Sequence, residues 1–186
     1  ARLGADWIYF FNDVQGGVAG LRDMQASWAE AGRAEADLYT TAFTCGCVLA
    51  EGEAYDSPRA MAEAGPRAAV LLHRAADDAL AGWQNTSAIP ASVRREVEGY
   101  VAMARGYEPK DAPYLENHRG HLMFVKETER QFVTADLIRE TTFSGTEDEI
   151  STRVAALRDA GYRQFTVQLM PGSEDEVAAI LDYCSA

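Results

Sequence analysis

No run of apolar residues in the 186-residue chain approaches the roughly 20 needed to cross a bilayer, and the first six residues lack the basic-then-apolar order of a signal peptide. We therefore expect a cytoplasmic protein with no membrane partner. Basic residues are also scarce, 17 against 29 acidic ones, and no run of Lys or Arg concentrates positive charge. With a net charge of −12, the sequence predicts no nucleic-acid partner.

Short phosphate-binding and nucleophile motifs are absent as well. The patterns GxSxG, GxxxxGK[ST] and GxGxxG do not occur, so hydrolase, nucleotidase and dinucleotide-binding functions have no support. There are only three cysteines, and Cys45 and Cys47 fall within a segment that is typical of a buried strand. A metal site there would need further ligands nearby, so the sequence favours small core residues in a reducing compartment.

The order of apolar patterns predicts alternating strands and helices in one domain, or in part of one. Short aromatic and β-branched runs predict strands over residues 6–11, 37–49 and 164–169. Amphipathic spacing predicts helices over residues 14–31, 57–80 with a break at 65–66, 90–105, 146–160 and 174–184. Such alternation implies parallel strands with right-handed crossovers. Only about three strands are visible, too few for an eight-stranded barrel of about 250 residues.

Residues 107–143 interrupt this regular order. Pro109, Pro113 and Gly120 break a mixed stretch that holds two of the three histidines, although residues 134–139 are more regular. Long irregular insertions are often functional. We therefore expect this insertion to be the least regular part of the chain and to cover the site.

Several stretches resemble the luciferase-like flavin- or deazaflavin-dependent oxidoreductase (monooxygenase) superfamily, in the same order. Residues 2–8, RLGADWI, resemble the family's "ADGWI" segment, and residues 47–51 with 58–60 resemble a later strand and helix. Residues 145–150, GTEDEI, resemble its "GTPEE" helix start before the last strand. Residues 115–122, LENHRGHL, are similar to the subgroup that resembles methylenetetrahydromethanopterin reductase.

The resemblance implies an α/β fold, the C-terminal part of an incomplete TIM (β/α)8 barrel, with parallel strands, outer helices and one long insertion. It implies hydride transfer or monooxygenation of a small organic substrate, with FMN or the deazaflavin coenzyme F420 in the intact enzyme. The family's early barrel loops and its phosphate-holding glycine loop precede the "ADGWI" segment, so none of their residues can be carried over. We therefore expect this chain alone to lack much of the cofactor site.

A non-catalytic half barrel is the alternative to an oxidoreductase. An unclosed parallel sheet leaves strand edges and apolar faces that need cover. Such a chain would pair with itself as a homo-oligomer, with a partner chain, or with the missing N-terminal half of the barrel.

The insertion carries the strongest candidate site. His118, Arg119 and His121 combine titratable, cationic and hydrogen-bonding groups, and in a barrel they would lie near the mouth formed by the C-terminal ends of the strands. An imidazole there could donate a proton, and the guanidinium could pair with an anion. Solvated loop residues are an equally good explanation of the cluster.

Three further residues are candidates by position. Asn12 follows the first predicted strand, at the end that faces the site in parallel α/β structures. Gly145 and Thr146 open a helix whose free amides could meet an anion. Plain N-capping explains them more simply, because Thr146 and Glu149 have the spacing of a capping box.

The sequence predicts no metal site and identifies no catalytic residue. Asp77 and Asp78 fall on the surface of a predicted helix, and the acidic run 147–149 fits the helix dipole. His73 stands among Ala and Leu on the same helix as Asp77, where a structural histidine is the usual explanation.

Overall fold

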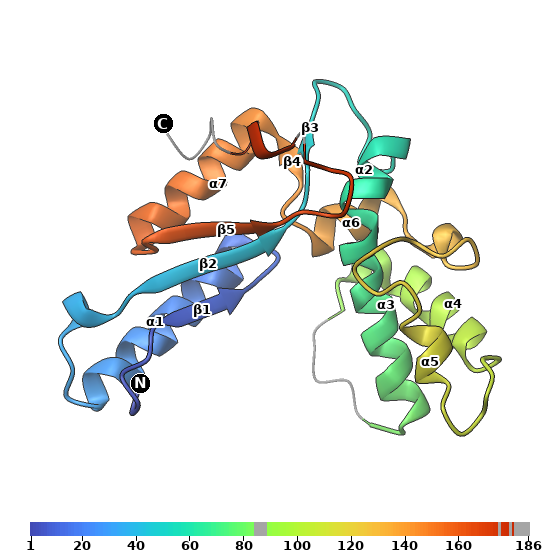
Figure 1. Ribbon diagram of the computed structural model, residues 1–186, viewed down its shortest axis with the longest axis horizontal. Coiled ribbons are helices and arrows are strands. Elements are labelled where there is room, and N and C mark those ends of the chain that lie inside the picture. The colour runs from blue at the N-terminus through green and yellow to red at the C-terminus, as the bar shows by residue number, and fades with distance from the viewer. Residues whose placement is uncertain (84–88, 175, 179, 181–186) are drawn as a thin grey trace.

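The computed structural model describes residues 1–83, 89–174, 176–178 and 180. The described chain is mixed α/β, with parallel strands and several helices. A parallel sheet in the order β1-β2-β5 joins Trp7–Phe10, Thr40–Cys45 and Gln164–Gln168 (Figure 1). The arrowheads of all three strands point toward the side of the molecule where α3 stands in Figure 1. The carboxyl ends of the strands therefore face the helical part of the chain.

The helices and the remaining strands complete the element order. The helices are α1 (Val14–Glu30), α2 (Pro58–Glu63), α3 (Gly65–Leu80), α4 (Arg94–Ala104), α5 (Tyr114–Asn117), α6 (Ala135–Thr141) and α7 (Glu147–Ala160). The 3-10 turns are η1 (Glu35–Asp37), η2 (Ala91–Val93) and η3 (Arg130–Phe132). A second, two-stranded parallel sheet pairs β3 (Val48–Leu49) with β4 (Gly145–Thr146).

Helices α1 and α7 cover one face of the three-stranded sheet. Leu21 of α1 and Leu157 of α7 are buried in the same cluster as Ala42 of the central strand. Because side chains alternate between the two faces of a strand, Ile8 and Phe43 lie on the opposite face. Ile8 is 59% exposed there. An apolar sheet face thus remains open to solvent in the described part of the chain.

A second core forms around α3, away from the sheet. Leu72 of α3, Tyr100 of α4 and Ile138 of α6 belong to one buried cluster and are fully buried. The Ala-rich sequence of α3 explains this packing, because small side chains let α4 and α6 approach its axis closely. α3 is consequently a fixed support for the polar groups that it carries.

Most of the predicted elements are confirmed. The structure has the predicted helix after the first strand, the break before Pro66, and the Thr146 and Glu149 capping box that starts α7. Gly161 ends α7 at φ 114, a left-handed conformation that glycine adopts without strain. The predicted helix over residues 174–184 lies partly outside the described residues.

The single strand predicted over residues 37–49 is wrong. Residues 35–37 form η1, β2 ends at Cys45, and Val48–Leu49 belongs to the other sheet. Gly46 marks the break, because a Cβ on it would lie 2.6 Å from the carbonyl carbon of Phe143. The chain bends where another backbone segment approaches closely, and hydrophobicity alone does not signal such a contact.

The insertion over residues 107–143 is only partly irregular. It contains α5, η3 and α6, and Asn117, Lys126 and Glu129 within it are 0%, 3% and 0% exposed. Among the described residues, no helix is long and apolar enough to span a membrane.

Candidate functional site

Two groups of polar side chains lie along α3, and the first of them stands at the carboxyl end of β1. The first surrounds Arg67, near the start of α3, and the second surrounds His73, further along the same helix. His73 and Asp77 are four residues apart, so they project from the same side of α3. One rigid helix therefore positions side chains for both groups.

Arg67 lies over the end of β1. Its guanidinium carbon is 4.4 Å from the centre of the Phe10 ring, and Nη2 donates a hydrogen bond of 2.7 Å to Oδ1 of Asn12. Its Nε is buried and has no hydrogen-bond partner among the described residues. Burial lowers the pKa of Arg67, although arginine stays protonated in proteins. The group thus offers a positive charge and a free donor at the carboxyl edge of the sheet.

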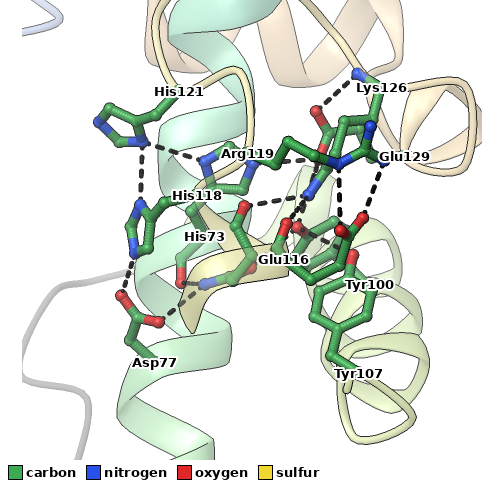
Figure 2. A network of polar contacts seen from close by, with 11 residues as sticks. His73, Asp77, Tyr100, Tyr107, Glu116, His118, Arg119, His121, Lys126 and Glu129 are labelled. Atoms are coloured by element: carbon green, nitrogen blue, oxygen red, sulfur yellow. Dashed lines mark hydrogen bonds and ion pairs between the residues drawn. The ribbon is translucent and has the colours of Figure 1, made fainter. Parts of the chain in front are cut away.

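Three histidines converge beside α3 (Figure 2). Nδ1 of His121 lies 3.1 Å from Nδ1 of His118 and 3.2 Å from Nδ1 of His73. His118 ends α5, and the chain turns back through Gly120, whose φ of 77 favours glycine. His73 is fully buried and the other two rings are half-buried. Residues far apart in the sequence thus place three imidazole nitrogens around one point.

In two of these rings, Nε2, the nitrogen that does not face His121, lies within hydrogen-bond distance of a carboxylate. Nε2 of His118 lies 2.6 Å from Oδ2 of Asp77, and Nε2 of His73 lies 3.0 Å from Oε2 of Glu129. An ionised carboxylate only accepts hydrogen bonds, so each Nε2 carries the proton that it donates. When the rings of His73 and His118 are neutral, their Nδ1 atoms are therefore unprotonated, and each directs its lone pair toward His121.

A network of buried hydrogen bonds keeps the three histidines in this arrangement. The ammonium group of Lys126 is 3.2 Å from Glu129 and donates to the carbonyl oxygens of Glu116 and Asn117, which end α5. The side-chain amide of Asn117 donates to the carbonyl of His73 at 2.9 Å and to Oδ1 of Asp77 at 2.7 Å. Two hydrogen bonds from Asn117 therefore attach α5 to α3 beside the histidines.

The local electrostatics follow from burial and from these bonds. Burial of Glu129 opposes its ionisation, but hydrogen bonds from His73 and from the backbone of Lys126 outweigh this and lower its pKa. Burial, together with the neighbouring His73 and His118, lowers the pKa of His121. Burial also raises the pKa of Tyr100, whose hydroxyl donates to Asn117. The site thus favours a neutral His121 and an ionised Glu129.

A surface pocket of about 540 Å³ opens beside this cluster. His118 and His121 line it together with Asp77, Asp78 and Trp83. A solute can therefore reach the two half-buried rings, whereas His73 stands behind them.

The residues singled out from the sequence divide into three places. His118 and His121 lie together, whereas the guanidinium of Arg119 turns away and pairs with Glu116 at 2.9 Å. Asn12 binds Arg67 at the sheet edge. Gly145 and Thr146 form β4 and the N-cap of α7, with their backbones paired to β3.

Four residues of the site were not predicted to belong to it from the sequence: Arg67, His73, Asp77 and Glu129. Asp77 was expected on a solvated helix surface, but it accepts hydrogen bonds from His118 and Asn117. The spacing of His73 and Asp77 on one helix side was the available signal. The sequence could not show that residues 117–129 fold back against that side.

Comparisons with known proteins find similarity among solved structures. No protein-family model matches the chain, and no curated protein matches it. Among solved structures, it is similar to a coenzyme F420-dependent tetrahydromethanopterin reductase from Methanopyrus kandleri, with 13% sequence identity and a TM-score of 0.49. The alignment covers 94% of this chain and 43% of that one, so the chain spans less than half of the length of its neighbour.

Proposed function

We propose that this chain is part of a flavin- or deazaflavin-dependent oxidoreductase barrel and contributes one side of its cofactor or substrate site. The motif resemblance supports the family, and the succession of parallel strands with α1 and α7 on one sheet face fits the outer layer of a barrel. In this proposal the open sheet face is the barrel interior.

The observation that carries the proposal is the position of Arg67. Ligands of parallel α/β folds bind beyond the carboxyl ends of the strands. Arg67 stands at that edge with a buried, unpartnered Nε among the described residues, held by Phe10 and Asn12. A guanidinium fits a phosphate or carboxylate through charge-assisted hydrogen bonds. FMN and coenzyme F420 both carry such anionic groups.

The residues of this chain would bind and orient the cofactor. A flavin or deazaflavin supplies the hydride chemistry when bound. Arg67 would hold an anionic group, and Asn12 would keep the guanidinium in place.

Titration of the purified chain with FMN and with coenzyme F420, followed by fluorescence, tests the proposal. We expect weak but saturable binding of one cofactor. Replacing Arg67 with Met should weaken it about tenfold to a hundredfold, because a hydrogen bond to a charged group contributes roughly 1.5–3 kcal/mol. Arg158→Met, on the exposed side of α7, is the charge-matched control and should bind like the wild type. The absence of binding by both cofactors, or equal binding by Arg67→Met, would contradict the proposal.

A non-catalytic half barrel is the second candidate, and the open sheet face favours it. Ile8 is 59% exposed on that face, and β1 and β5 each pair with one strand in the described part of the chain. Unpaired strand edges and exposed apolar faces promote association. In this case the chain would form homo-oligomers or pair with a complementary part of the barrel.

Light scattering coupled to size-exclusion chromatography tests the pairing. We expect a dimer or a larger species, and Ile8→Lys should shift it toward the monomer. A stable monomer at high concentration would contradict self-association through this face.

A further inference from the structure

The three histidines beside α3 have an arrangement that hydrogen bonding alone does not explain. Each neutral imidazole has one N–H and one lone pair. When His118 and His73 are neutral and donate from Nε2 to Asp77 and Glu129, both of these rings direct lone pairs at Nδ1 of His121. His121 can donate its single Nδ1 proton to only one of them. At least one close contact between nitrogens is therefore left without a proton.

We propose that His73, His118 and His121 form a binding site for a divalent transition-metal ion, with Zn²⁺ as the reference ion. A cation between the three rings accepts all three lone pairs and removes the conflict between them. One nitrogen of each ring lies within 4.8 Å of the other two. This site is independent of the cofactor proposed above.

The spacing of the nitrogens fits a tetrahedral ion. Zn–N bonds of about 2.0–2.1 Å place two ligand nitrogens about 3.3 Å apart in a tetrahedron. The two separations at His121 are 3.1 and 3.2 Å. The remaining separation, between the ligand nitrogens of His73 and His118, is at most 4.8 Å. The buried His73 supplies a fixed reference point for the site.

The carboxylates of Asp77 and Glu129 occupy the positions expected behind metal-bound histidines. A ligating histidine usually donates its other ring nitrogen to a carboxylate, which fixes the tautomer and the orientation of the ring. Two of the three rings have such a partner, at 2.6 and 3.0 Å (Figure 2).

The charges around the site are balanced without the ion. Asp77 and Glu129 contribute two negative charges, and Lys126 and Arg67 bring positive charge nearby. An added divalent cation is therefore opposed by Arg67 and by Arg74, and it is attracted by Asp77 and Asp78; Arg74, Asp77 and Asp78 all line the pocket. We expect the three imidazole ligands, more than the surrounding charges, to determine the affinity for the metal ion.

The ligand set also selects the class of ion and leaves a coordination position free. Imidazole ligands suit Zn²⁺, Cu²⁺, Ni²⁺ and Fe²⁺ rather than Mg²⁺ or Ca²⁺, which prefer oxygen. Three protein ligands leave a fourth position for water or another small ligand, as in catalytic zinc sites. The pocket lined by His118 and His121 gives that position access to solvent.

Titration of the tag-free, chelator-treated chain with Zn²⁺ and with Co²⁺ tests the site. We expect one ion per chain by calorimetry and by elemental analysis, and visible Co²⁺ absorption typical of tetrahedral nitrogen coordination. Added azide should change the Co²⁺ spectrum through the fourth position. Mg²⁺ should not compete. If the Co²⁺ spectrum is octahedral, or if azide leaves it unchanged, the proposed geometry is wrong.

Substitutions at the half-buried rings separate this site from nonspecific binding. His118→Ala and His121→Ala should each weaken Zn²⁺ binding at least about a hundredfold, with an unchanged far-ultraviolet circular dichroism spectrum. Asp77→Asn should weaken it about tenfold to a hundredfold through the orientation of His118. Asp78→Asn removes the same charge from the next residue and should change the affinity less than about threefold. Binding that survives both histidine substitutions, or no stoichiometric binding to the wild type, overturns the proposal.

Discussion

Nε2 of His73 lies 3.0 Å from Oε2 of Glu129, although 56 residues separate the two in the chain. Both side chains are almost completely buried, at 1% and 0% exposure. The contact joins α3 to the middle of the insertion. The insertion is thus held against α3 by a buried polar bond, and its loss should affect stability as well as the candidate site.

Glu129→Gln should strongly destabilise the fold. The substitution keeps the side-chain volume but leaves the Lys126 ammonium, 1% exposed, without its buried counter-ion. Removing one partner of a buried ion pair typically costs about 3–5 kcal/mol. Chemical unfolding followed by circular dichroism measures this loss.

Glu127→Gln is the matched control for that experiment. Glu127 is two residues away in the same insertion and is exposed, so its substitution should change the free energy of unfolding by less than about 0.5 kcal/mol. Equal effects of the two substitutions would show that Glu129 does not anchor the insertion.

Gly46→Ala should destabilise the chain through a backbone clash. The new Cβ would lie 2.6 Å from the carbonyl carbon of Phe143 and 2.7 Å from the nitrogen of Ser144. Forcing these segments apart should cost about 1–3 kcal/mol. Gly16→Ala is the opposite case, because its Cβ would meet Asp13 only at 3.4 Å and beyond, within α1. It should be neutral or add up to about 1 kcal/mol. Thermal unfolding of both variants checks the predicted difference in sign.

Local sequence patterns predicted much of the fold. α1 follows from amphipathic spacing, and α7 follows from the Thr146 and Glu149 capping box, because both signals lie within a few residues. The boundary at Gly46 could not be predicted in this way. It depends on the backbone of residues 143–144, almost 100 positions later in the chain.

The candidate site was predictable only where its residues are close in sequence. His118 and His121 are three residues apart and indeed lie together, but Arg119 between them turns toward Glu116. His73, Asp77 and Glu129 join them through tertiary packing of the insertion on α3. No local pattern identifies a histidine on an Ala-rich helix as part of a cluster until its distant neighbours are known.

Cys45 and Cys47 should resist alkylation in the native protein. Burial raises their pKa to about 11 and about 12, respectively, and the thiolate is the reactive form. Treatment with iodoacetamide at pH 8, followed by peptide mass spectrometry, should leave both unmodified in the native chain and modified in urea. Native modification of Cys47 at the rate of the unfolded chain would contradict the buried position.

A second ionic network connects β3, α2 and the described end of the chain. Arg59 of α2 lies 2.9 Å from Glu63 and 2.7 Å from Glu176, and it also pairs with Glu53. Glu176 in turn accepts a hydrogen bond of 3.0 Å from the backbone nitrogen of Val48. The single guanidinium of Arg59 therefore forms ion pairs with three carboxylates, whose negative charges repel one another.

This repulsion predicts that stability depends on pH through Glu63. Burial and the nearby charge of Glu176 raise the pKa of Glu63 from 4.5 to about 7. Since the folded pKa lies above the unfolded value, the protonated form stabilises the fold below pH 4.5. That contribution is lost as pH rises toward 7. Glu53 behaves in the opposite way, because the hydrogen bond from Arg59 lowers its pKa to about 2 and its contribution is lost only below pH 4.5. Measurements between pH 5 and 8 thus report on Glu63.

Glu63→Gln should therefore gain stability relative to the wild type as pH rises from 5 to 8. The amide cannot ionise, so it avoids the unfavourable buried charge while keeping an oxygen that accepts from Arg59. Allowing for solvent screening, we expect a relative gain of about 1 kcal/mol over this interval. Urea unfolding of both proteins at each pH measures it, and the groups common to the two proteins cancel in the difference. In a Glu176→Gln background the pH dependence of that difference should shrink, because the second carboxylate no longer raises the pKa of Glu63. A difference that is the same at pH 5 and pH 8 would mean that Glu63 ionises in the folded chain as readily as in the unfolded one.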